Sequence, residues 1–352
     1  MDYKKEIENL VSLVVKAGGS DIHLSEGRQP IIRVSGNLIP LVKVPAMTKN
    51  DMRGFMDVLL SPQSKMLLDK EKNVDFSYSL PDTRFRGNIF FRQGYVSIAL
   101  RIIPMTIKTL AELNLPPILE TFTRKPQGFF LVVGPIGQGK TTTLAAMIEM
   151  INQTRTEHIL TIEDPIEYQF ESKKSIIDQR EIRIDTPDFS NALIAMFRED
   201  IDVCMVGEMR NPETMATAVT AAETGHLIFS TLHTNNASQT LNRIIDAFPA
   251  NEQDQIRTQL SVSLTGIFSQ RLVPRISGGL IPAYELLISN QAVSNLIREK
   301  RMHEIDTVIE TSSQEGMIDL NRCLADLVRA GEIAVETAYT HSLNPKVLEK
   351  MI

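Results

Sequence analysis

The fold of this chain is decided by the segment Gly-Pro-Ile-Gly-Gln-Gly-Lys-Thr at residues 134–141. This segment fits the pattern GxxxxGK[ST] of a phosphate-binding loop. A continuous apolar run, Phe129–Val133, comes directly before it, and a helical pattern, Thr142–Gln153, follows it. A strand before the loop and a helix after it are the context in which this motif binds phosphate, so a chance match in a glycine-rich turn is the minor alternative.

The residue types in this loop suit the binding of a nucleoside triphosphate. Glycines allow backbone conformations and close approach that side chains would block, and backbone N–H groups at the start of a helix then point at the phosphates. We expect Lys140 to reach the β- and γ-phosphates and Thr141 to offer its hydroxyl to Mg²⁺. The sequence therefore predicts ATP and Mg²⁺ as cofactors. The residues expected to bind them are Gly134, Pro135, Gly137, Gln138, Gly139, Lys140, Thr141 and Thr142.

After the loop, apolar runs alternate with helical patterns. The runs end at Glu163, at Glu208 and near His233. Alternation of this kind predicts a parallel sheet with helices on both faces, which is the α/β class. Continuous apolar runs are typical of strands that are buried on both faces. From about residue 250 onward the pattern favours helices.

The N-terminal hundred residues have a different pattern, which predicts a small α+β domain. Residues 3–17 place apolar side chains at helical spacing. A hairpin is expected with its turn at Ser35-Gly36-Asn37, between strands Ile31–Val34 and Leu38–Leu41. One helical region is expected at about 48–69. Further strands are expected at Val74–Leu80, Arg84–Arg92 and Tyr95–Ile103.

These patterns divide the chain into two domains. The chain has 352 residues, of which 43% are hydrophobic, enough for more than one core. Prolines at positions 104, 116 and 117 indicate a linker over residues 104–117. We therefore expect an N-terminal α+β domain at 1–103 and an ATPase domain with C-terminal helices at 118–352.

Composition argues against several classes of function. The net charge of −6 and the pI near 5.6 argue against nucleic acid as the main partner. No stretch approaches the ~18–20 apolar residues that a membrane span needs. Cys204 and Cys323 are far apart and no CxxC pair exists, so no cysteine zinc site is expected and the compartment is taken to be reducing. These features favour a cytoplasmic protein whose membrane association is peripheral.

Four polar residues at the ends of the apolar runs are candidates for chemistry. Glu163 and Glu208 should lie beside the phosphate loop, because ligands of an open α/β sheet bind outside the carboxyl ends of its strands. One carboxylate can orient or deprotonate water while acidic groups hold the metal shell. The alternative is that they cap the next helices. His226 and His233 bracket an apolar run and are interpreted as sensors near the γ-phosphate, with a structural histidine as the alternative.

The chain resembles the type IV pilus retraction ATPases (PilT and its paralogue PilU), within the secretion ATPase superfamily, over nearly its whole length. The segments that carry the resemblance are GGSDIHL at 18–24, RFRGNIF at 84–90, LRIIP at 100–104, GKTTTLAAMI at 139–148, TIEDPIEY at 161–168, FREDIDVCMVGEMRNPETM at 197–215, TAAETGHLIFSTLHTNNA at 220–237 and NRIIDAFP at 242–249.

The resemblance implies a fold and a set of roles. The fold is a PAS-like N-terminal domain followed by a RecA-like ATPase domain, assembled as a homohexamer. Glu163 would be the catalytic carboxylate that activates water, and Glu208 would act near Mg²⁺. His226 and His233 fall in the histidine box of the family.

Three arginines also match the family. Arg84 and Arg86 fall on one face of an alternating strand. With Arg101 they resemble the arginines that reach ATP across the junction between domains or subunits. A positive group of this kind stabilises the transition state and can be worth about 10³–10⁵ in rate. The alternative is a solvated strand face.

The function that the resemblance implies is an ATPase whose hydrolysis drives retraction of a type IV pilus and twitching motility. Its partners would be an inner-membrane platform protein, the rest of the pilus machinery and a paralogous retraction ATPase. Ser294 stands where retraction ATPases typically carry arginine, which favours a PilU-like or divergent PilT-like subunit and keeps open a regulatory ring subunit with weak hydrolysis.

Two further alternatives remain. A pilus extension or type II secretion ATPase usually carries a tetracysteine zinc insert, which this sequence lacks. A nucleic-acid translocase can share the RecA-like fold, and the acidic pI argues against it.

Overall fold

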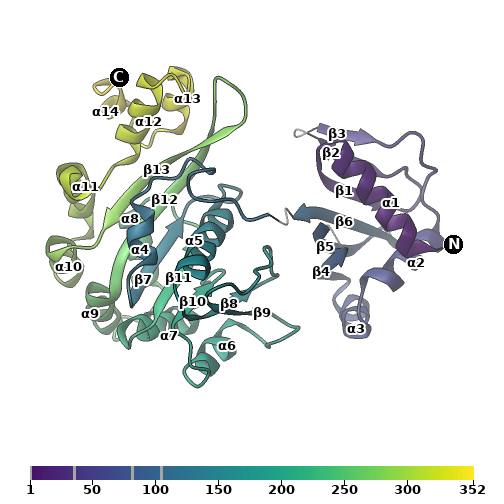
Figure 1. Cartoon of the computed structure of the whole chain (residues 1–352), viewed down its shortest axis with the longest axis horizontal. Helices are drawn as coiled ribbons and strands as arrows, with labels where there is room; N and C mark the ends of the chain where they lie inside the picture. Colours follow the sequence, from purple (N-terminus) through teal and green to yellow (C-terminus); the bar gives the residue numbers. More distant parts are fainter. Residues whose placement is uncertain (1, 35–36, 81–82, 104–105) are drawn as a thin grey trace. The chain divides into compact units, whose positions relative to one another are not determined.

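The computed structural model describes residues 2–34, 37–80, 83–103 and 106–352 (Figure 1). Contacts divide the chain into two units, which we describe separately. Unit 1 comprises Met1–Thr106 and Pro165–Gln169, and unit 2 comprises Ile107–Asp164 and Phe170–Ile352. The expected turn residues Ser35 and Gly36, and Pro104 at the start of the expected linker, lie outside the described residues. The linker at 104–117 stays a prediction, and the sequence did not indicate that Pro165–Gln169 groups with the N-terminal residues.

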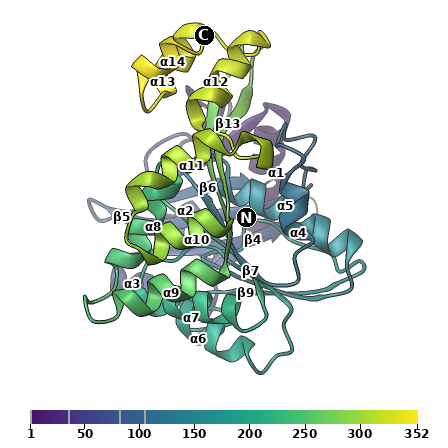
Figure 2. The same cartoon turned by 90° about the vertical axis from the view of Figure 1, so that its left-hand side faces the viewer.

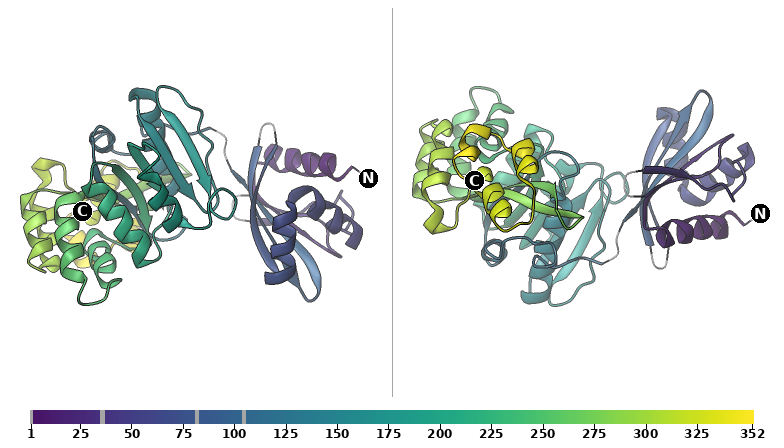
Figure 3. Two further views of the ribbon diagram at one scale, coloured as in Figure 1. Left: turned by 90° about the horizontal axis from the view of Figure 1, so that it is seen from below. Right: turned by 90° about the horizontal axis from the view of Figure 1, so that it is seen from above.

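Unit 1 is built on a six-stranded antiparallel sheet with strand order β3-β2-β1-β6-β5-β4. Its strands are β1 (Gly19–Ser25), β2 (Ile31–Val34), β3 (Asn37–Pro40), β4 (Asn73–Leu80), β5 (Thr83–Arg92) and β6 (Tyr95–Ile103). Its helices are α1 (Tyr3–Lys16), α2 (Lys49–Leu59) and α3 (Pro62–Glu71). Helix α1, purple in Figure 3, packs on β1 through the buried side chains Ile7, Leu10, Val11 and Val14. The predicted α+β domain has this architecture.

The single helical region expected at about 48–69 is wrong, because the structure has two helices there. Helix α2 ends at Leu59, and Ser61 is extended, with ψ near 161°. Pro62 is the first residue of α3. Proline lacks an N–H and disfavours the helical conformation of the residue before it, so the break falls at Ser61.

Unit 2 is built on a seven-stranded sheet with strand order β13-β12-β7-β11-β10-β8-β9. Six of these strands are parallel, and β13 runs antiparallel at one edge. The strands are β7 (Gly128–Val133), β8 (His158–Glu163), β9 (Ile176–Glu181), β10 (Val203–Val206), β11 (Leu227–Leu232), β12 (Leu264–Pro274) and β13 (Leu280–Ile288). Every residue of β7, β10 and β11 is buried, as the continuous apolar runs predict.

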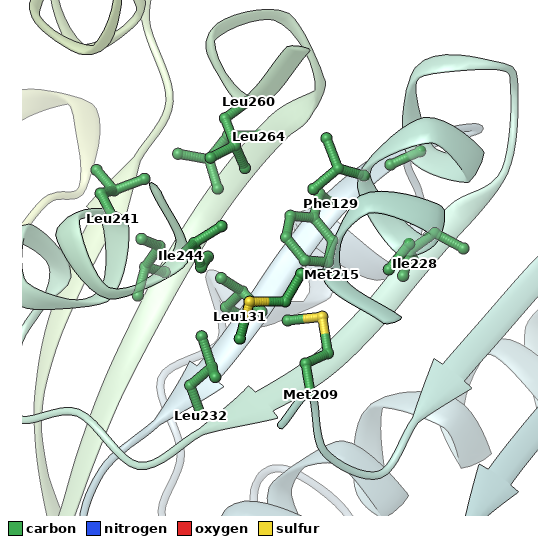
Figure 4. Packing of buried hydrophobic residues seen from close by; sticks show 14 of the residues in the cluster. Phe129, Leu131, Met209, Met215, Ile228, Leu232, Leu241, Ile244, Leu260 and Leu264 are labelled. Carbon is green, nitrogen blue, oxygen red and sulfur yellow. The ribbon is translucent and has the colours of Figure 1, made fainter. Parts of the chain in front are cut away.

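Helices cover both faces of this sheet, so the predicted α/β layering is confirmed. Alternate residues of β7 point to opposite faces: Phe129 and Leu131 join a core with α6 to α11, whereas Phe130 and Val132 join a core with α4 and α5. Figure 4 shows the first of these cores and Figure 2 the helices around it. These helices are α4 (Leu119–Thr123), α5 (Lys140–Thr154), α6 (Phe189–Met196), α7 (Pro212–Glu223), α8 (Ala237–Asp246), α9 (Gln253–Ser263), α10 (Gln291–Arg298) and α11 (Ile305–Thr311).

The last helices form a smaller layer of their own. A separate core joins them to β12 and β13. They are α12 (Leu320–Arg329), α13 (Val335–His341) and α14 (Pro345–Glu349), preceded by two 3-10 turns at Met302–Glu304 and Ser313–Glu315.

The prediction that the chain is mostly helical after about residue 250 is wrong for β12 and β13. These strands have 11 and 9 residues and pair as an antiparallel hairpin, while β12 also pairs in parallel with β7. Most of β12 is buried, so its sequence shows no alternation of apolar and polar residues. The polar pair Ser269 and Gln270 interrupts the apolar run, so the sequence pattern does not indicate the strand.

Glu285 on β13 is a buried carboxyl group, with 7% of its surface exposed. Its Oε1 accepts a hydrogen bond of 2.7 Å from the backbone N–H of Ala237, the first residue of α8. Burial raises the pKa of Glu285 to about 7; the Ala237 bond and the charge of Arg271 lower the pKa, and the charges of Asp306 and Asp319 raise it. Because the folded state holds this proton more tightly than the unfolded chain, stability falls as the pH rises from about 4.5 through about 7.

We expect Glu285→Gln to remove this pH dependence. Glutamine keeps an oxygen acceptor for Ala237 and has no charge to bury. The melting temperature of the variant should exceed that of the unaltered protein by roughly 2–4 °C at pH 8 and match it at pH 5, measured by differential scanning calorimetry. Glu336→Gln, on the exposed surface of α13, is the control. A difference of the same size at both pH values would contradict the expectation.

Candidate active site

Four neighbouring parallel strands bring the phosphate loop, Glu163, Glu208 and His233 to one edge of the sheet. Strands β7, β11, β10 and β8 lie side by side in that order. The loop at 134–141 follows β7, His233 follows β11, and Glu208 follows β10, while Glu163 is the last residue of β8. The carboxyl ends of parallel strands are where ligands bind in such sheets.

The loop at 134–141 has the backbone of a phosphate cradle. Gly137 and Gly139 have φ values of 76° and 77°, in the left-handed region that favours glycine. Helix α5 begins at Lys140, and no side chain caps its N-terminus. The first N–H groups of this 15-residue helix therefore suit an anion, to which the positive end of the helix dipole adds. The loop thus fits the phosphates of the nucleotide that the sequence predicts.

Lys140 is 7% exposed and lies at the centre of the site. Its Nζ donates to the backbone oxygens of Gly134 and Pro135, each at 2.8 Å, and lies 3.1 Å from Nδ1 of His233. A lysine ammonium is only a donor, so Nδ1 of His233 accepts and the ring carries its proton on Nε2. Burial lowers the pKa of His233, and the charge of Lys140 lowers it further.

His233 joins the loop to Glu208. Its Nε2 lies 3.8 Å from Oε2 of Glu208, and the other oxygen of this carboxylate pairs with Arg210. This ion pair raises the pKa of Arg210. Lys140, His233, Glu208 and Arg210 thus form a continuous polar chain across three strand ends. A phosphate that takes a hydrogen bond of Lys140 acts directly on this chain.

Glu163 is 3% exposed, and two neutral side chains bond to one oxygen of its carboxylate. Thr161 Oγ1 donates to Oε1 at 2.8 Å, and Gln179 Nε2 donates to the same oxygen at 3.3 Å. The segment that follows β10 lies close to Glu163, because the backbone N–H of Gly207 donates to the backbone oxygen of Ile162 at 2.8 Å. A buried carboxylate oriented in this way can direct or deprotonate a water molecule.

Sequence reasoning did not identify Thr161 and Gln179 as supports of Glu163. Thr161 lies two residues before Glu163 in β8, so the alternation of a strand places the two side chains on one face. This two-residue spacing is a sequence signal from which the contact between Thr161 and Glu163 could have been predicted. Gln179 comes from β9, the partner of β8, and no local pattern indicates that pairing.

Two predicted site residues can hold Mg²⁺. The hydroxyl of Thr141 and the carboxylate of Glu208 are oxygen donors, which suit this hard cation, and it usually keeps water molecules and phosphate oxygens as its other ligands. Within the described residues there is no group of three or more His, Cys, Asp or Glu side chains that could hold a metal. The two residues therefore fit a metal ion that arrives with the nucleotide.

His226 is not brought together with Lys140. It precedes β11, whereas His233 follows it; the strand has six residues, which places the two histidines about 20 Å apart along it. Nδ1 of His226 bonds the oxygen of Ala221 at 3.0 Å, and its ring meets that of Phe197 edge-on at 5.4 Å. A role for His226 in sensing the nucleotide stays a prediction.

Arg84 and Arg86 lie in unit 1 on β5, and both contact the segment 165–169. Arg84 is 7% exposed, and its Nε donates to the oxygen of Ile166 at 3.2 Å. Nη1 of Arg86 lies 3.5 Å from Oε1 of Glu167. The two arginines therefore share a face of the strand, as their spacing predicts. Their reach to ATP stays a prediction.

Arg101 lies on β6, opposite Arg86 in the register of the sheet. Its side chain is 68% exposed, and its Nε donates to Oδ1 of Asp21 at 2.8 Å. Burial raises the pKa of Asp21, but hydrogen bonds from Ser20 and Arg101 outweigh it and lower the pKa below its ordinary value. The role of Arg101 toward ATP also stays a prediction.

Comparison with known proteins places these features in context. A family model described as "Type II/IV secretion system protein" matches residues 3–279. The chain is 41% identical to the type IV pilus retraction ATPase PilT of Pseudomonas aeruginosa, over 95% of this chain and 97% of that protein. It is 38% identical to the type IV pilus ATPase PilU of the same organism, over 99% of this chain and 91% of that protein. A crystal structure of the pilus retraction motor PilT with bound ADP matches with a TM-score of 0.91 and 44% identity, over 97% of this chain and 98% of that one.

We expect Lys140→Ala to abolish measurable binding of Mg-ATP in calorimetry. The substitution removes the only charge that we place at the phosphates from this loop and leaves the oxygens of Gly134 and Pro135 without their donor. Lys174→Ala, which alters an exposed lysine of the same unit, should bind Mg-ATP like the unaltered protein. Undiminished affinity of Lys140→Ala would refute its place in the phosphate site.

Proposed function

We propose that this chain, which belongs to the Type II/IV secretion system protein family, hydrolyses ATP to drive the retraction of a type IV pilus. The predicted resemblance to that superfamily is confirmed, and so is the predicted pairing of a RecA-like ATPase domain with a smaller N-terminal domain. The observation that carries the function is the match to PilT over nearly all of both chains, together with an intact phosphate loop facing two acidic strand ends.

In the mechanism, this chain binds the nucleotide and orients the attacking water. The N–H groups at the start of α5 and the ammonium of Lys140 hold the phosphates. Glu163, fixed by Thr161 and Gln179, directs water toward the terminal phosphorus and accepts its proton. Thr141 and Glu208 would hold Mg²⁺, which when bound neutralises charge on the phosphate oxygens.

His233 couples the state of the nucleotide to the protein. The Lys140 ammonium bonds to two loop oxygens and to Nδ1 of His233. A γ-phosphate must compete with these bonds, so its arrival and its loss change the hydrogen bond to His233. Because the residues after His233 lead directly into α8, the change passes from the site into a helix.

We further propose that the chain acts as a homohexamer in the cytoplasm. Arg84, Arg86 and Arg101 would reach ATP across the junction between domains or subunits, so activity would depend on assembly. The ring would act on an inner-membrane platform protein of the pilus machinery and would associate with the membrane only peripherally. In the described part of the chain, no helix combines the length and the apolar character needed to cross a bilayer.

A PilU-like accessory subunit is the second candidate. The chain aligns with PilU over a larger share of its length than with PilT, although at lower identity. Ser294, on α10, has a short side chain without a charge, at the position where the retraction ATPases typically carry arginine. A subunit of this kind would work beside a paralogous ATPase.

Deletion of the gene, followed by counts of surface pili, tests the function. Loss of retraction should leave cells with more surface pili than the parent and without twitching motility. Restoration by the unaltered gene and failure of the Lys140→Ala allele would tie the effect to ATP. Cells without pili would point to extension instead. A deletion strain that still retracts pili unless a paralogue is also removed would favour the accessory role.

We expect Glu163→Gln to retain nucleotide binding and to lose turnover. Glutamine keeps the size and an oxygen for Thr161, but it cannot accept a proton from water. The ATPase rate should fall about 10²–10⁴-fold, while the affinity for Mg-ATP in calorimetry stays within about threefold of the unaltered value. Glu171→Gln, at an exposed position, is the control. Undiminished hydrolysis by Glu163→Gln would refute the assigned role.

A further inference from the structure

Strand β12 contacts the phosphate loop through Gln270, a buried side chain with 3% of its surface exposed. Oε1 of Gln270 accepts a hydrogen bond of 2.6 Å from the hydroxyl of Thr143, in the first turn of α5. Nε2 donates to the backbone oxygen of Gln138 at 2.7 Å. One amide group therefore bridges a peptide of the loop and the helix whose N-terminus faces the phosphates.

The surroundings of Gln270 determine the orientation of its amide. The oxygen of Gln138 can only accept, so it must face the NH₂ group, and the hydroxyl of Thr143 then faces the amide oxygen. The loop also packs closely on the same strand. A Cβ at Gly134 would lie 2.3 Å from the backbone oxygen of Gln270, and one at Gly139 would lie 2.9 Å from its Nε2.

Gln138 makes a second link in the opposite direction. Its Oε1 accepts a hydrogen bond of 2.7 Å from the backbone N–H of Leu272 on β12. Strand β7 is paired with β12 only as far as Val133 and Ser269, so beyond that point the side chain of Gln138 takes the place of a strand partner. A serine at position 138 would be too short for its hydroxyl to reach the backbone N–H of Leu272.

We propose that Gln138 and Gln270 form a clasp that holds the phosphate loop against β12 in its nucleotide-binding geometry and slows the release of ADP. Gln270 is a positioning residue in this proposal, since its bonds go to the loop and to α5. The clasp rests on the proposed nucleotide site. A loop held in its bound conformation loses less conformational freedom on binding, and this increases the affinity.

The test uses the full chain and the fluorescent nucleotide mant-ADP. We expect Gln270→Met, which keeps the length of the side chain and removes both bonds, to raise the Kd about tenfold and to accelerate dissociation in stopped-flow measurements. Gln138→Ser loses only the bond to Leu272 and should release mant-ADP several-fold faster with a normal melting temperature. The matched control is Gln259→Met. It removes an amide of α9 that is bonded to the side chain of Glu223 at the end of α7.

The outcomes separate the clasp from the function on which it rests. Faster release by both Gln270→Met and Gln138→Ser, with the control unchanged, would support the clasp. If Gln270→Met fails to fold, the release rate of Gln138→Ser decides. Release rates equal to that of the unaltered protein, or a lower melting temperature without any change in release, would overturn the clasp alone. An unaltered protein that binds no mant-ADP would overturn the proposed function and the clasp with it.

Discussion

The parallel pairing of β7 with β11 is the constraint on which the rest of unit 2 depends. It places the end of β7, where the phosphate loop begins, beside the end of β11, which His233 follows directly. With this register, Nζ of Lys140 lies 3.1 Å from Nδ1 of His233. Strands β10 and β8 extend the same edge and add Glu208 and Glu163. The site is therefore a row of strand ends. The positions of its residues are fixed because the strands that carry them are buried on both faces of the sheet.

Much of the site could be predicted from the sequence, because its parts are local. The apolar run before the loop, the glycines within it and the helix after it all lie within about thirty residues, the size of one βαβ unit. Glu163 and Glu208 could be found because each ends an apolar run. The histidines show the limit of this reasoning. Both bracket the same strand, but only His233 lies at the end that carries the loop, and the direction of a strand follows from its pairing in the sheet.

The features that were missed depend on contacts between distant segments. Gln270 follows Gln138 by 132 positions, and its importance appears only when β12 pairs with β7. The same burial that makes β12 a central strand removes the alternation by which a strand is recognised. The break between α2 and α3 has a local cause, because Pro62 disfavours the helical conformation of Ser61, and this signal is present in the sequence.

The grouping of Pro165–Gln169 with unit 1 has a consequence for the path of the chain. The backbone passes between the two units three times, after Thr106, after Asp164 and after Gln169. The second crossing begins two residues after Glu163. A fragment made of the first 106 residues would therefore lack the peptide that Arg84 binds, and a fragment beginning after residue 117 would leave that peptide without its arginine. Exchange of either unit as one uninterrupted stretch of sequence would therefore separate Arg84 from Ile166.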